Sequence, residues 1–66
     1  MKLRINGEVT EAEEGASVSD LLEKLGHTPG SVVVAINEQF IPRPRHPDTQ
    51  LQANDRIEIL APMQGG

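Results

Sequence analysis

The sequence contains no cysteine, and its 66 residues include a single aromatic side chain, Phe40. The absence of cysteine excludes disulfides, thiolate metal sites and a cysteine nucleophile. With one aromatic residue available, the core has to be built from aliphatic side chains. There is no signal-like apolar segment at the N-terminus and no membrane-spanning run, so we expect a cytoplasmic protein with no membrane partner.

Basic residues are also scarce: six Lys and Arg stand against ten Asp and Glu, for a net charge of −4. No basic stripe with interleaved aromatics is present, so we expect no nucleic-acid partner. A chain of this length forms one small domain, which buries about 60% of the surface that its unfolded form exposes.

The most informative feature that is present is the terminal pair Gly65-Gly66. Two residues without Cβ atoms make a thin backbone that can thread a narrow channel in another protein. A free carboxylate on Gly66 would be a group that can be activated as an acyl donor. The alternative is a frayed chain end of no functional consequence.

The first half of the chain carries clear local signals. Asn6-Gly7 between alternating apolar positions predicts a hairpin of strands at about 2–6 and 8–11. Ser17 and Asp20 form a capping-box pattern that starts a helix at Val18. An i, i+3, i+4, i+7 stripe of Val18, Leu21, Leu22 and Leu25 carries the helix to about residue 25, and Gly26 ends it.

The second half predicts further strands. The apolar run 32–36 indicates a central strand, 40–41 a short return before the prolines, and 56–60 an alternating last strand. The pattern predicts an α+β fold, a ubiquitin-like β-grasp with a mixed sheet of about four to five strands and one main helix. The helix crossover favours a parallel partner for 32–36, and the last strand is expected beside the first. The predicted core packs the helix stripe on Leu3, Ile5, Val9, Ile57 and Ile59. Residues 1–61 would form the domain and 62–66 a flexible tail.

One face of the sheet is predicted to stay uncovered and to serve partner docking. The run 32–36 does not alternate, so its pattern leaves open which of its side chains face outward. Our expected docking residues are Val34, Ile36, Leu60 and Met63. The alternative is that this strand is simply covered on both faces.

Other chemistry-bearing residues form no recognisable site. His27 and His46 have no acidic or thiol partner at ligand spacing, so we expect no metal. Ser17 is explained as a helix cap, and the glycines are spaced for turns rather than for a phosphate-binding loop. We therefore expect no bound cofactor and no enzymatic activity in this chain.

Six stretches occur in an order and spacing that one known family shares: Leu3–Gly7, Ser17–Leu25, Val34–Asn37, Ile41–Arg43, Asp55–Leu60 and the tail Pro62–Gly66. Together they resemble the ThiS family of thiamine-pathway sulfur carriers. The proline-rich stretch 44–47 departs from the family pattern.

The resemblance implies a β-grasp fold with Gly66 as the acyl carrier and Gly65 as its slender neighbour. The Gly66 carboxylate would be adenylated by an E1-like, ThiF-like adenylyltransferase that uses ATP and Mg²⁺. It would become a thiocarboxylate with sulfur relayed from a cysteine desulfurase, and a ThiG-like thiazole synthase would consume that sulfur.

Three alternatives stay open at this point. The small subunit of molybdopterin synthase shares the fold, tail and chemistry but has another acceptor. Ubiquitin-like conjugation would use the same adenylate with a lysine amine. A non-catalytic β-grasp interaction module would make the Gly-Gly pair incidental.

Overall fold

Two residues join the first strands of the sheet, β1 (Lys2–Ile5) and β2 (Glu8–Glu11). Asn6 and Gly7 have φ angles of 49° and 87°, as a type I′ turn requires. The hairpin predicted from Asn-Gly is therefore confirmed. The structure, a computed structural model, describes residues 1–28 and 30–61.

The helix α1 (Val18–Lys24) begins and ends as its sequence indicates. The Ser17 Oγ accepts from the Asp20 N–H at 3.1 Å, and the Asp20 carboxylate accepts from the Ser17 N–H at 3.0 Å. At the other end, Gly26 has φ +84°, its N–H donates to the Glu23 carbonyl, and the His27 N–H donates to the Leu22 carbonyl. This is a Schellman motif, and it makes Leu25 the cap rather than the last helical residue.

The last strand, β5 (Arg56–Leu60), lies in the middle of a five-stranded sheet of order β2-β1-β5-β3-β4. It pairs parallel to β1 and antiparallel to β3 (Val33–Ile36), which in turn pairs with β4 (Gln39–Ile41). The prediction that the last strand lies beside the first is confirmed, as is the mixed α+β sheet with one main helix. The predicted parallel partner for 32–36 is wrong: β3 runs in the same direction as β2, but β1 and β5 lie between them.

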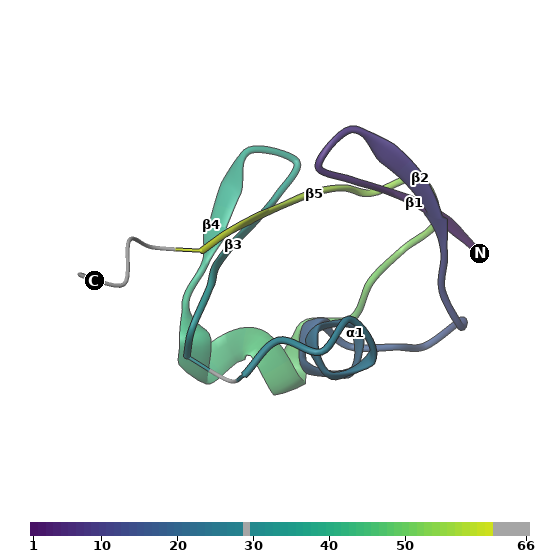
Figure 1. Cartoon of the computed structure of the whole chain (residues 1–66). Helices are drawn as coiled ribbons and strands as arrows, with labels where there is room; N and C mark the ends of the chain where they lie inside the picture. Colours follow the sequence, from purple (N-terminus) through teal and green to yellow (C-terminus); the bar gives the residue numbers. More distant parts are fainter. Residues whose placement is uncertain (29, 62–66) are drawn as a thin grey trace.

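The proline-rich stretch folds into a 3₁₀ helix, η1 (Arg43–Asp48). Proline fixes φ near −65°, which a 3₁₀ turn accepts. The Arg45 N–H donates to the Pro42 carbonyl at 2.9 Å, and η1 packs beside α1 (Figure 1).

The sheet arches over α1 and η1, so one of its faces covers the core and the other is open (Figure 1). The buried apolar side chains are Leu3, Ile5, Ala12, Val18, Leu21, Leu22, Val32, Val34, Ile36, Leu51, Ile57 and Ile59. Within residues 1–28 and 30–61, no helix has the length and hydropathy needed to cross a bilayer.

Two side chains predicted in the core are exposed: Val9 is 60% and Leu25 40% accessible. A two-residue turn pairs Arg4 with Val9, so Val9 shares the open face with Arg4 rather than the buried face with Leu3. Leu25 is the helix cap and lies past the last position of the buried stripe.

Candidate functional site

The candidate site begins where β5 carries the chain to the end of the sheet. β5 ends at Leu60, and Ala61 is the last residue that the structure describes. The predicted tail 62–66, with Met63, Gly65 and Gly66, lies outside the described residues. Its boundary with the domain and the functions expected of its residues therefore stay predictions.

Asn6 holds β5 close to the point where the tail begins. Its Nδ2 donates to the Ile59 carbonyl at 3.1 Å, and its Oδ1 accepts from the Ile59 N–H at 2.8 Å. The β1–β5 pairing itself reaches only Ile5 and Ile57, so the side-chain amide extends this parallel ladder toward the root of the tail. The sequence indicated the turn at Asn6 but gave no signal of this second role, which joins residues far apart in the chain.

The other hairpin turn makes an equivalent contact from the opposite side of β5. Asn37 and Glu38 have φ angles of 50° and 72°, again a type I′ turn. The Asn37 Oδ1 accepts from the Arg56 N–H at 3.0 Å, and its Nδ2 donates to the Asp55 carboxylate at 3.1 Å. One asparagine thus holds each end of the central strand.

Four apolar side chains on the open face lie next to the end of β5, and we call them the outer apolar patch: Val33, Ala35, Phe40 and Leu60. The strand register pairs Val33 with Leu60 and Ala35 with Phe40. Leu60 and Phe40 are 65% and 60% exposed, and Val33 is 39% exposed.

The docking residues predicted from the sequence are partly wrong. Val34 and Ile36 are 0% and 9% exposed, because their register partners Ile59 and Ile57 face the core. They cannot meet a partner from that position. On this strand Val33 is exposed and Ala35 is half-buried on the open face. Leu60 is exposed as expected, and Met63 lies outside the described residues.

The middle of the open face is charged. Arg4 lies directly beside Arg56 in the parallel ladder, and the Arg56 guanidinium is 3.9 Å from the Glu38 carboxylate in an exposed ion pair. Glu58 follows on β5 and separates these cations from the outer apolar patch. The face is therefore divided, with its apolar half at the end from which the tail leaves.

Groups that could carry chemistry within the described part of the chain are few. No cluster of three or more His, Asp or Glu side chains there could hold a metal ion. The buried polar side chains are Ser17, which caps α1, and His46, whose Nε2 lies 3.0 Å from the Ile41 carbonyl. Since a carbonyl only accepts, this ring nitrogen carries the proton.

Comparison with known proteins gives consistent results. The chain is 29% identical to the sulfur carrier protein ThiS of Escherichia coli over the full length of both chains. It is 36% identical to the ThiS sulfur carrier of Thermus thermophilus, covering 94% of this chain and 95% of that one. A thiazole synthase of Magnetococcus marinus is 36% identical over all 66 residues, and the chain spans only 20% of its length.

The fold gives the same result. A crystal structure of the thiamine biosynthesis protein ThiS from Geobacter metallireducens superposes with a TM-score of 0.85, at 29% identity and full coverage of both chains. The predicted ubiquitin-like β-grasp is confirmed by this likeness. The ThiS family model matches residues 3–66. The chain therefore belongs to the ThiS family of sulfur carrier proteins of thiamine biosynthesis.

Proposed function

We propose that this chain is a cytoplasmic sulfur carrier whose Gly66 carboxylate is adenylated, converted to a thiocarboxylate and used as the sulfur source for thiazole formation. The observation that carries the proposal is the extent of the family match, which runs through the terminal Gly65-Gly66 pair. The Escherichia coli carrier supports it further, because it aligns over the whole of both chains.

The chemistry requires activation because a carboxylate is a poor electrophile. One Gly66 carboxylate oxygen attacks the α-phosphorus of ATP, and pyrophosphate leaves. The terminal sulfur of a persulfide made by a cysteine desulfurase then attacks the acyl carbon, and AMP departs with the activated oxygen. A thiol, such as that of cysteine, cleaves the S–S bond of the resulting acyl disulfide, which leaves the thiocarboxylate on Gly66 and a new disulfide as the oxidised product. ATP and Mg²⁺ belong to the E1-like, ThiF-like adenylyltransferase, and this chain supplies the acyl group.

Gly65 serves this reaction by being small. The activating enzyme has to surround the end of the tail to exclude water from the acyl adenylate, and a residue without Cβ lets its walls come close. Ordering each tail residue costs about 1 to 2 kcal/mol of backbone entropy, which the contacts of the folded domain have to offset.

We place the domain contacts on the outer apolar patch. It borders the last described residues of β5, so an enzyme that receives the tail has to cover this part of the sheet. A ThiG-like thiazole synthase is the second partner that this surface would serve. The Magnetococcus marinus thiazole synthase supports this pairing, since one fifth of that protein is similar to this chain.

Intact-mass spectrometry tests the carrier proposal. The protein is incubated with the activating enzyme, ATP, a cysteine desulfurase and cysteine, and the expected mass gain is that of one oxygen replaced by sulfur. Deleting Gly66, or adding a residue after it, is expected to abolish the gain while the thermal midpoint stays unchanged. A shortened protein that still gains this mass would show that Gly66 is not the acyl carrier.

Two matched substitutions test the docking surface. Leu60→Asp introduces a charge into the outer apolar patch, and Val9→Asp introduces the same charge at a similarly exposed position on β2. We expect Leu60→Asp to weaken binding to the activating enzyme by about tenfold or more, and Val9→Asp to change it little. Equal effects of the two variants would remove the patch from the proposal and leave the tail chemistry untouched.

A further inference from the structure

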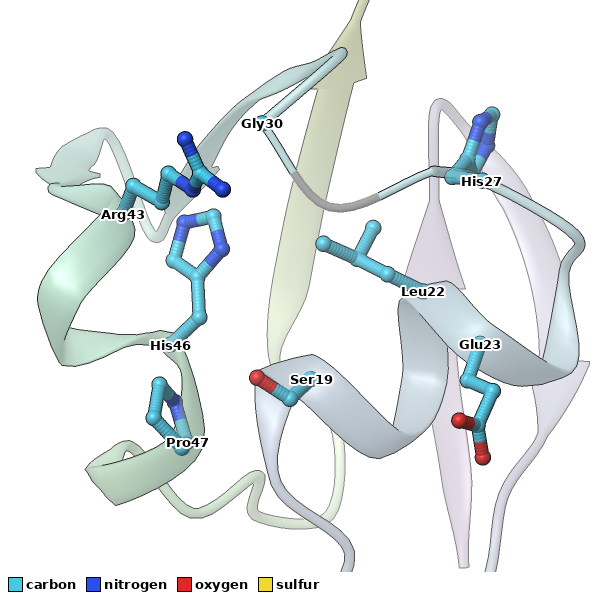
Figure 2. A pocket seen from close by; sticks show the side chains of 8 residues that line it. All are labelled: Ser19, Leu22, Glu23, His27, Gly30, Arg43, His46 and Pro47. Atoms are coloured by element: carbon cyan, nitrogen blue, oxygen red, sulfur yellow. The ribbon is translucent and has the colours of Figure 1, made fainter.

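A cavity of about 270 Å³ lies between α1, η1 and the loop that follows α1, on the side of the sheet opposite the outer apolar patch. Arg43 and His46 of η1 line one wall of the cavity, and His27 borders it on the other side. In Figure 2 the Leu22 side chain is directed toward the wall formed by η1, while the His27 ring points away from it. The sequence pattern indicated no partner for either histidine, but the fold brings both to one cavity together with an arginine.

Arg43 is positioned by the absence of a side chain at residue 30. A Cβ on Gly30 would lie 2.8 Å from the Arg43 Cζ and Nη1 atoms, so the guanidinium packs directly against the glycine. Within residues 1–28 and 30–61, no carboxylate pairs with Arg43 and no hydrogen bond uses its donors. Glu23 also borders the cavity, but Figure 2 shows its carboxylate turned away from Arg43 and His46.

His46 adds a buried imidazole ring to the cavity, with one ring nitrogen in a hydrogen bond to the backbone. The residue is 5% exposed, and its Nε2–H donates to the Ile41 carbonyl at 3.0 Å. The other ring nitrogen, Nδ1, makes no hydrogen bond in the described part of the protein, and Figure 2 shows a ring nitrogen facing the cavity. In a neutral imidazole with Nε2 protonated, Nδ1 is an acceptor.

We propose that this cavity binds a small phosphate, either inorganic phosphate or a compact phosphate monoester. The Arg43 guanidinium offers two parallel donors to two phosphate oxygens that share negative charge. Nδ1 of His46 accepts from a phosphate hydroxyl, and His27 borders the opening on the other side. Near neutral pH inorganic phosphate keeps at least one hydroxyl, and a monoester, which loses its second proton with a pKa of about 6, keeps one in its singly charged form.

The cavity chemistry and size both restrict the ligand. An ionised carboxylate or sulfate has no hydroxyl to donate to the Nδ1 lone pair, so it satisfies only the guanidinium. Drug-sized ligands occupy pockets of about 300 to 1,000 Å³. A cavity of about 270 Å³ therefore suits a phosphate with at most a few carbon atoms, and the apolar Leu22 side chain would contact that carbon portion.

The test is a titration of the ¹⁵N-labelled protein at pH 7 and constant ionic strength, followed by amide chemical shifts. Inorganic phosphate is expected to give saturable shifts in residues 19–30 and 43–47. Glycerol phosphate distinguishes the two sources of the group, because tighter binding of the ester identifies an esterified ligand and equal binding identifies free phosphate. Sulfate is expected to bind about tenfold more weakly, a difference of about 1.4 kcal/mol.

Arg43→Gln and Arg45→Gln form a matched pair, because each removes one cation from η1 and only Arg43 lines the cavity. Both side chains are exposed, so neither change is expected to affect folding. We expect Arg43→Gln to weaken phosphate binding about tenfold or more and Arg45→Gln to leave it within twofold. No saturable shift, equal losses in the two variants, or equal affinity for sulfate would each overturn the proposal. None of these results depends on the thiocarboxylate assay.

Discussion

Replacing Asn6 by alanine would remove both contacts that hold the end of β5. The side chain donates to the Ile59 carbonyl at 3.1 Å and accepts from the Ile59 N–H at 2.8 Å. It also occupies a turn position with φ +49°, which asparagine tolerates better than alanine. The substitution therefore combines the loss of two hydrogen bonds with a backbone penalty.

The expected cost follows from these two parts. Each hydrogen bond contributes about 0.5 to 1.5 kcal/mol, so both together contribute about 1 to 3 kcal/mol. The left-handed conformation costs an alanine about 1 to 2 kcal/mol. We expect Asn6→Ala to lower the free energy of unfolding by about 2 to 5 kcal/mol, out of about 3 to 10 kcal/mol for a domain of this length.

Asn54 provides a matched control, because it has φ +71° and its side chain makes no hydrogen bond in the described part of the protein. Asn54→Ala should therefore cost only the conformational part, about 1 to 2 kcal/mol. Asn6→Gly should cost only the hydrogen bonds, about 1 to 3 kcal/mol.

Urea unfolding followed by far-UV circular dichroism measures these differences in a chain without tryptophan or tyrosine. If Asn6→Ala is no more destabilising than Asn54→Ala, the side-chain contacts to β5 contribute nothing and our reasoning is refuted.

Three further predictions concern the helix and the sheet. Ser17→Ala removes the acceptor for the Asp20 N–H and should cost about 1 kcal/mol in urea unfolding, and an unchanged midpoint would contradict the capping role. In Gly26→Ala the added Cβ would contact no other atom, but the residue would still need φ +84°, so the change should lower the free energy of unfolding by about 1 to 2 kcal/mol. A gain in stability in urea unfolding would show that the backbone relaxes there. Val34→Asp should unfold the protein by burying a charge, while Val33→Asp should leave it folded by circular dichroism; the reverse order would mean that β3 has the opposite face inward.

The parts of the fold that were predictable depend on local chemistry. The turn at Asn6, the cap at Ser17 and the helix end at Gly26 each involve residues within a few positions of one another, so the sequence carries the whole signal. The position of β5 was also predictable, because a helix crossover and a short last strand leave few topologies for a mixed sheet.

The features that were missed depend on contacts between distant residues. The run 32–36 is apolar throughout, so it has no period-2 signal to say which side faces the core, and pairing with β5 decides that Val34 and Ile36 are buried. His46 is buried because residues 43–48 form a 3₁₀ helix that packs against α1, and this packing joins parts of the chain that are far apart in the sequence.

The central place of β5 has a consequence for how this chain folds during synthesis. Each hairpin forms from neighbouring residues, but the two hairpins are joined into one sheet only by β5, residues 56–60, which pairs with β1 on one side and β3 on the other. Until these residues leave the ribosome, the edge of each hairpin that β5 later covers stays open and offers unpaired backbone groups to other chains. Completing the sheet is therefore a late event, and the chain is most prone to aggregate just before the residues that precede the Gly-Gly tail become available.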